Sequence, residues 1–247
     1  MANQGYWEKV VECTNGYKFV TKYAGGVQLS GGKRAKRAKP TSEQKERYNI
    51  RKTIERLFHL LLCNFIPGDY HLVFTYPRGT VQSISEAKKK FSDFLGLYRK
   101  YCKEHGYKCK YVYNTEIGGN GALHHHCIMP CHKDIEFIEE LWAQAGGGKI
   151  QSRSKLWANY DWYGLAEYFV DKTKGGKLPD THIPNERRYV PSKGLIKPIT
   201  RVRRVESLRW YKPKASQGYE LIPDSIREGV DELKGGNFIK YAMRRLI

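Results

Sequence analysis

Apolar positions recur along the chain with two different periods, which predict its strands and helices. Residues 7–14 and 17–23 flank Asn15-Gly16, a pair favoured in two-residue turns, so they are expected to form a β-hairpin. Apolar residues at helical spacing follow Thr41-Ser-Glu-Gln44, which fits a capping box at the start of a helix. Pro67 marks the end of that helix.

The middle of the chain alternates between the two periods. Strands are predicted at 71–76, 110–117, 122–129 and near 149–155, and helices at 84–106, 134–142 and 163–173. The order strand, helix, hairpin, helix, strand, helix predicts an α+β fold, in which helices pack on an antiparallel sheet and cover one of its faces.

Three consecutive parts are expected from these patterns. Residues 1–66 hold the hairpin, a basic arm at 30–39 and the first helix, while residues 67–176 hold the α+β core. Residues 177–247 form a basic extension that ends in a short amphipathic helix at 237–246.

Charge is the strongest global signal, because 44 Lys and Arg oppose 25 Asp and Glu, a net charge of +19. Such an excess indicates a polyanionic partner and favours nucleic acid, although solubility alone is the alternative. No stretch approaches the ~20 apolar residues that span a bilayer. Since the N-terminus lacks an apolar signal core, the six cysteines are expected to be reduced thiols in the cytoplasm.

Three consecutive histidines lie in the middle of a predicted strand. Side chains alternate along a strand, so His124 and His126 point to one face and His125 points to the other. Two imidazoles on one rigid face can bind a divalent ion, for which Glu116 on the partner strand is the nearest further ligand.

The register of this hairpin decides whether Glu116 faces the histidines. If Ile117 pairs with Ala122 across a four-residue loop, Thr115 lies opposite His124 and Glu116 faces away. A glycine bulge in the turn would shift the register by one residue and bring Glu116 to the same face.

Tyr168 is the candidate nucleophile. On a helix it shares a face with Lys172, whose charge favours the phenolate and can bind a phosphate. The alternative is that Leu165, Tyr168 and Phe169 form an ordinary core stripe.

Cations and flat rings alternate after residue 186, as is typical of surfaces that bind single-stranded nucleic acid. A solvated surface with anchoring aromatics is the alternative. The cations expected to contact DNA are Arg187, Arg188, Lys193, Lys197, Arg201, Arg203 and Arg204, and the interleaved rings are Tyr189, Trp210 and Tyr211.

Taken together, these segments resemble the Rep branch of the HUH endonucleases, the rolling-circle initiators of plasmids and phages. The similar motifs are Val73-Phe-Thr-Tyr76, Asn114-Thr-Glu-Ile117, His124-His125-His126 and the helical Tyr168 followed by Lys172. They occur in the family's order, within residues 40–205.

Two positions depart from the family pattern. His125 stands where the family has an aliphatic residue, and Lys172 comes four residues after Tyr168, with Asp171 at the usual third position. The basic stretch 187–198 resembles the tail that follows the nicking tyrosine in bacterial and phage relatives.

The resemblance implies a nickase that forms a 5′-phosphotyrosine at Tyr168, with Mn²⁺ or Mg²⁺ held by His124, His126 and Glu116. It also implies single-stranded or hairpin origin DNA, a host helicase and a polymerase as partners, in the cytoplasm of a bacterial host. A conjugative relaxase and a tyrosine transposase share this chemistry.

Two alternatives need no such chemistry. One is a zinc-stabilised nucleic-acid-binding protein, whose ligands would come from His125, Cys127, Cys131 and His132, although their spacing is not that of a common zinc finger. The other is a basic structural protein.

Overall fold

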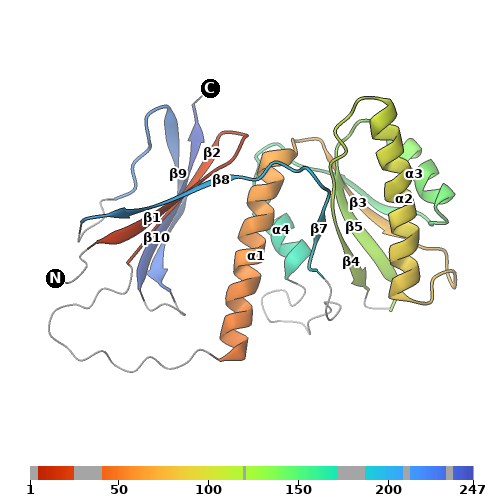
Figure 1. Cartoon of the computed structure of the whole chain (residues 1–247), viewed down its shortest axis with the longest axis horizontal. Coiled ribbons are helices and arrows are strands. Elements are labelled where there is room, and N and C mark those ends of the chain that lie inside the picture. Colours follow the sequence, from red (N-terminus) through yellow and green to blue (C-terminus); the bar gives the residue numbers. More distant parts are fainter. Residues whose placement is uncertain are drawn as a thin grey trace. The chain divides into compact units, whose positions relative to one another are not determined.

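The computed structural model describes residues 5–24, 41–118, 121–171, 187–207, 212–231 and 236–246. These residues form two five-stranded antiparallel sheets and four helices (Figure 1), which confirms the expected α+β fold. The helices are α1 (Ser42–Asn64), α2 (Ile84–Glu104), α3 (Ile135–Gln144) and α4 (Tyr163–Val170). No helix in the described residues combines the length and apolar character needed to cross a membrane.

Two compact units make up the chain. One is formed by residues 53–196 and the other by residues 1–52 together with 197–247. The division into three consecutive parts made from the sequence differs from these units, one of which joins segments that are distant along the chain.

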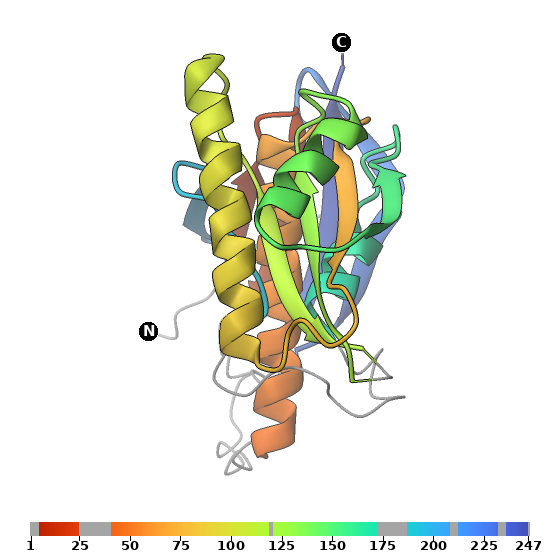
Figure 2. The same ribbon diagram turned by 90° about the vertical axis from the view of Figure 1, so that its right-hand side faces the viewer.

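The unit formed by residues 53–196 contains the sheet with strand order β6-β3-β5-β4-β7. Helices α2 and α3 cover one face of this sheet, and α4 lies on the opposite face (Figure 2). The expectation of one covered face was therefore incomplete. The strands are β3 (Tyr70–Thr75), β4 (Val112–Ile117), β5 (Leu123–Met129), β6 (Ile150–Lys155) and β7 (Val190–Pro191).

An aromatic core joins the sheet to α2 and α3. The ring of Phe74 on β3 packs 4.8 Å from Phe94 and 5.4 Å from Trp142, measured between ring centroids. All three side chains are fully buried, and burial of such rings supplies much of the stabilisation of a core. This core holds the strands in place, so the side chains on the other face of the sheet keep fixed positions relative to one another.

The glycines that follow α3 have a steric role. A Cβ atom on Gly147 would lie 2.0 Å from the indole of Trp142, so no side chain fits there. Trp142 also donates a hydrogen bond from its indole nitrogen to the carbonyl of Thr75, at 3.1 Å. The glycines therefore let the indole reach the end of β3.

The capping box predicted at Thr41–Gln44 is present, and α2 also begins with a side-chain cap. At the start of α1, the amide of Gln44 donates to the hydroxyl of Thr41, and the amide of Thr41 donates to the side chain of Gln44. At the start of α2, the amide of Glu86 donates to the hydroxyl of Ser83. Each bond satisfies a backbone donor that has no partner inside its helix.

The second unit contains the sheet with strand order β8-β1-β2-β10-β9. The hairpin predicted around Asn15-Gly16 is confirmed as β1 and β2, and Gly16 adopts a φ of 88° in the turn. The basic arm at 30–39 lies outside the described residues. The strands are β1 (Tyr6–Glu12), β2 (Tyr17–Ala24), β8 (Ile199–Val205), β9 (Tyr219–Val230) and β10 (Asn237–Arg245).

The helix predicted at 237–246 was wrong, because this segment forms β10. Ile239, Tyr241 and Met243 are buried at every second position, which is the period of a strand. Pairing of β10 with both β2 and β9 satisfies its backbone on both sides. The alternation of buried residues therefore indicated a strand, but the sequence did not indicate which strands β10 pairs with.

Candidate active site

The hairpin of β4 and β5 carries the predicted metal ligands. Ile117 pairs with Leu123, and Glu116 lies directly opposite His124. Of the two registers considered from the sequence, the structure has the one that brings Glu116 to the same face as the histidines. The amide of Gly118 donates to the carbonyl of Ala122, so the loop holds one residue more and the register shifts by one.

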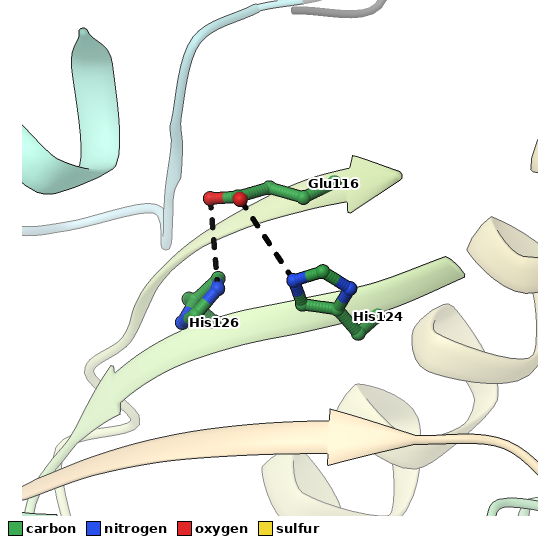
Figure 3. A group of neighbouring side chains, drawn as sticks. All are labelled: Glu116, His124 and His126. Atoms are coloured by element: carbon green, nitrogen blue, oxygen red, sulfur yellow. Dashed lines mark ion pairs between the residues drawn. The ribbon is translucent and has the colours of Figure 1, made fainter. Parts of the chain in front are cut away.

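Glu116, His124 and His126 come together on one face of the sheet (Figure 3). The carboxylate oxygens of Glu116 lie 3.8 Å from Nε2 of His124 and 3.6 Å from Nε2 of His126. One ligand atom from each residue lies within 4.8 Å of the others. Two imidazole nitrogens and a carboxylate fit a divalent transition metal, and this donor set suits Mn²⁺ better than Mg²⁺.

Asn114 connects this group to α4, and sequence reasoning missed it. Its side-chain amide donates to Oε1 of Glu116 at 3.1 Å and to the carbonyl of Phe169 at 2.9 Å. Asn114 is buried on the same strand as Glu116, two residues earlier, and that spacing was the available signal. The amide thus orients the carboxylate and holds the helix that carries Tyr168.

Tyr168 places its hydroxyl at the edge of the same group. The oxygen lies 3.2 Å from Nε2 of His126, the nitrogen that also faces Glu116. The residue as a whole is 45% exposed. Burial raises the pKa of the hydroxyl, and the negative charge of Glu116 raises it further.

Helix α4 holds Tyr168 through its buried neighbours. Leu165, Ala166 and Phe169 are buried, whereas Tyr168 lies on the side of the helix that faces β5. The core stripe considered as an alternative thus includes Leu165 and Phe169, and Tyr168 is not part of it. Tyr163, at the start of the helix, packs its ring edge-on against Phe58, 5.6 Å away.

The helix ends before Lys172. Val170 is its last residue, and the backbone is extended at Asp171, so the predicted helix over 163–173 was too long. Lys172 lies outside the described residues. The guanidinium of Arg188 donates to the carbonyl of Val170 at 2.8 Å, which satisfies an acceptor at the helix C-terminus.

His71 is a further residue at the site that sequence reasoning missed. Its ring stacks on His126 with centroids 5.6 Å apart and lies edge-on to Tyr168 at 6.3 Å. Burial lowers its pKa to about 4, so the ring is neutral near neutral pH. His71 lies on β3 two residues before Val73, so the two side chains project to the same face of the sheet. Val73 in turn pairs with His126.

His125 points into the opposite face, as the alternation predicted. The hydroxyl of Tyr76 donates to the carbonyl of Ala87 at 2.6 Å, so the Nε2–H of His125 donates to that hydroxyl, also at 2.6 Å. Nδ1 then accepts from the hydroxyl of Thr115 at 3.0 Å, and burial lowers the pKa of the ring to about 3. The middle histidine is therefore a neutral part of the core.

Replacing His125 with Ala should consequently lower stability rather than metal binding. The change removes a ring stacked 4.2 Å from Phe91. It also removes the imidazole nitrogens that bond the part-buried hydroxyls of Tyr76 and Thr115. We expect a loss of about 2–4 kcal/mol in the free energy of unfolding, measured by urea denaturation. An unchanged denaturation midpoint would contradict this role.

The residues that would form a zinc site are not gathered. His125 and Cys127 are buried in the core between β5 and α2, while Cys131 is exposed and His132 stacks on Tyr107. Within the described part of the chain, Glu116, His124 and His126 are the one group of three or more such ligands close enough to share an ion.

The predicted DNA-contacting cations differ in their surroundings. Arg187, Lys193 and Lys197 are exposed, and Arg188 is bonded to α4. On β8, Arg201 and Arg203 form ion pairs with Glu12 and Glu8. Arg204 is exposed and points to the opposite face of that strand.

Comparison with protein families adds an independent observation. Residues 69–173 match the family model of the replication-associated protein ORF2. The matched range covers less than half of the chain and contains β3, the β4–β5 hairpin and α4. It therefore includes Glu116, His124, His126 and Tyr168. The match supports a replication initiator family for this chain.

Searches of the curated proteins and of the solved structures gave no match. A functional assignment therefore rests on the match to the replication-associated family and on the geometry of the site.

Proposed function

We propose that the protein is a rolling-circle replication initiator that nicks and rejoins single-stranded origin DNA through a 5′-phosphotyrosine on Tyr168. One observation carries the proposal. The Tyr168 hydroxyl lies 3.2 Å from the same nitrogen of His126 that faces the carboxylate of Glu116. A nucleophilic oxygen thus adjoins a set of residues suited to hold a divalent ion, and the match to the replication-associated family supports the link to replication.

In this proposal Glu116, His124 and His126 hold Mn²⁺ or Mg²⁺. When bound, the ion would polarise and orient the scissile phosphate. Asn114 keeps the carboxylate of Glu116 directed toward the two imidazoles, because its amide donates to Oε1. The β4–β5 pairing fixes the spacing of all three ligands before DNA arrives.

The chemical step transfers a phosphoryl group without ATP. The phenol oxygen of Tyr168 attacks the phosphorus, the bond from phosphorus to the 3′-oxygen breaks, and the phenol loses its proton while the 3′-oxygen leaves as a hydroxyl. The new phosphotyrosine bond retains the energy of the broken one, so a 3′-hydroxyl can later attack it and rejoin the strand. Rigid support of Tyr168 by α4 favours the in-line geometry.

Other groups complete the proposal. Lys172 is proposed to stabilise the phenolate or bind the phosphate. The exposed cations Arg187, Lys193, Lys197 and Arg204 are proposed to contact the DNA backbone, whereas Arg201 and Arg203 are engaged by Glu12 and Glu8. The substrate would be single-stranded or hairpin origin DNA, and the released 3′-hydroxyl would serve a host polymerase working with a host helicase. A relaxase or a tyrosine transposase would use the same groups on different DNA.

The test is a search for the covalent intermediate. A pool of random single strands, labelled at the 3′ end, is incubated with the protein and Mn²⁺, because the downstream fragment keeps both the label and the tyrosine bond. A labelled band that migrates with the protein, resists denaturant and disappears with EDTA is expected. Failure to form that band on single-stranded and hairpin pools would overturn the proposal.

Asn114→Ala is expected to slow formation of the adduct by about 10–100-fold, the usual effect of removing a group that orients a metal ligand. The change frees the carboxylate of Glu116 and releases one bond to α4. The measurement is the rate of adduct formation against Mn²⁺ concentration. Binding of the uncleaved strand should change little, and a wild-type rate at every Mn²⁺ concentration would contradict this positioning role.

A further inference from the structure

One face of the β8-β1-β2-β10-β9 sheet carries flat rings in a single row across the strands. Trp7 on β1 pairs with Tyr23 on β2, and Tyr23 pairs with Phe238 on β10. Residues paired directly across an antiparallel sheet project to the same face, and neighbouring strands lie about 4.8 Å apart. The three side chains therefore form a continuous row, with Arg204 of β8 paired to Trp7 at its end.

The next row on this face supplies positive charge. Lys9 pairs with Thr21, Thr21 pairs with Lys240, and Lys240 pairs with Arg227. The ammonium of Lys240 also lies 5.6 Å from the ring centroid of Phe238. Neither row contains a carboxylate. We call the surface formed by Trp7, Lys9, Tyr23, Arg204, Phe238 and Lys240 the aromatic–basic face.

The opposite face of the same sheet has a different character. It holds the packed cluster of Val20, Ile239, Tyr241 and Met243. Both carboxylates of β1 project there and are matched by cations, Glu8 by Arg203 and Glu12 by Arg201. Two arginines of β8 are thus neutralised within the protein, whereas Arg204 lies on the aromatic–basic face.

Part of the aromatic–basic face is well exposed to solvent. Trp7 is 38% exposed, and Val202, which lies on the same face of β8 as Arg204, is 51% exposed. Arg204 is exposed as well. A ring and a cation that a bound strand could reach thus lie side by side, because Trp7 pairs with Arg204.

We propose that the aromatic–basic face binds single-stranded DNA, with bases stacked on its rings and phosphates beside its cations. Rings stack on any base, and cations next to them follow the backbone, so the combination fits an unpaired strand better than a duplex. The proposal deepens the proposed function by adding a second contact for the strand outside the nicking site. It rests on that function only for the choice of DNA over RNA.

The test compares two arginines of the same strand. Full-length protein is titrated into fluorescein-labelled oligo-dT in EDTA, and affinity is followed by fluorescence anisotropy over a range of salt concentrations. Arg204→Ala should weaken binding and lower the salt slope by about 0.7, the value for one lost phosphate contact on a single strand. Arg201→Ala removes another exposed charge, from the opposite face, and should leave the slope unchanged.

The aromatic contact is tested separately. Trp7→Ala should weaken binding about tenfold or more, in line with the loss of one stacked base, and Trp7→Phe should restore most of the affinity. Thermal denaturation of each variant shows whether the sheet remains folded. An intact sheet with unchanged affinity in both Trp7→Ala and Arg204→Ala would overturn the proposal.

Two further outcomes are decisive. Equal losses in Arg204→Ala and Arg201→Ala would mean that net charge, rather than this face, governs binding. Tighter binding of oligo-rU than of oligo-dT would overturn the choice of DNA. Because the assay contains no divalent ion and needs no cleavage, its outcome is independent of whether Tyr168 forms an adduct.

Discussion

Tyr168→Phe is expected to abolish the covalent DNA adduct completely while changing DNA affinity little. Phenylalanine keeps the ring beside His126 and His71 but lacks the oxygen that would attack phosphorus. The lost hydrogen bond to His126 is a single part-buried bond, so its removal should cost about 0.5–1.5 kcal/mol of stability. The measurement is the yield of labelled, denaturant-resistant band at saturating Mn²⁺.

Tyr163→Phe is the matched control. Both tyrosines lie on α4 and are exposed to a similar extent, 38% for Tyr163 and 45% for Tyr168. The ring of Tyr163 packs on Phe58 instead of facing the histidines, so this variant should keep full adduct formation. Mapping the labelled peptide to Tyr163 or to Tyr160 would show that the nucleophile has been assigned wrongly.

Replacing His124 or His126 by Ala is expected to remove Mn²⁺-dependent nicking to below detection. Each change deletes one of two nitrogen ligands and leaves a site that lacks half of its imidazole donors. The side chain of His124 is 19% exposed, so its removal should disturb the fold less than removal of His126, which is 3% exposed. His124→Ala therefore separates loss of metal from loss of structure.

Mn²⁺ binding provides the direct readout of this prediction. Electron paramagnetic resonance of free Mn²⁺ should show weakened binding in His124→Ala and His126→Ala, and in Glu116→Gln, which removes the charge with little change in shape. His125→Ala should keep Mn²⁺ binding because its ring lies on the other face, against Phe91. The same loss in all three histidine variants would contradict the assignment of ligands.

Local patterns in the sequence were sufficient to predict how much of the candidate site is arranged. Alternation along a strand separated His124 and His126 from His125, and helical spacing put Tyr168 next to buried neighbours. The side on which Glu116 lies depended on a single loop residue. Because one residue reverses every side chain of a strand, the two possible registers could not be distinguished until the hydrogen bond from Gly118 to Ala122 was known.

The second sheet could not be predicted for a different reason. Its central strand β2 pairs with β1 through a short turn, but also with β10, more than two hundred residues later. No local propensity encodes such a pairing, so 237–246 was assigned a helix although its buried positions alternate. Asn114 was missed for a similar reason, since its importance comes from the carbonyl of Phe169 on a distant helix.

The pairing of β2 with β10 has a consequence for how the protein is made. The β1–β2 hairpin is synthesised before the unit of residues 53–196, while its neighbours β8 and β10 are synthesised after that unit. An isolated two-stranded hairpin is marginally stable, and each unpaired edge is a template for other strands. The unit that carries Tyr168 can fold during synthesis, because all of its strands emerge before residue 197. The β1–β2 hairpin, in contrast, must wait for strands that follow that unit in the chain, so premature termination leaves aggregation-prone edges on the hairpin even when the unit of residues 53–196 is complete.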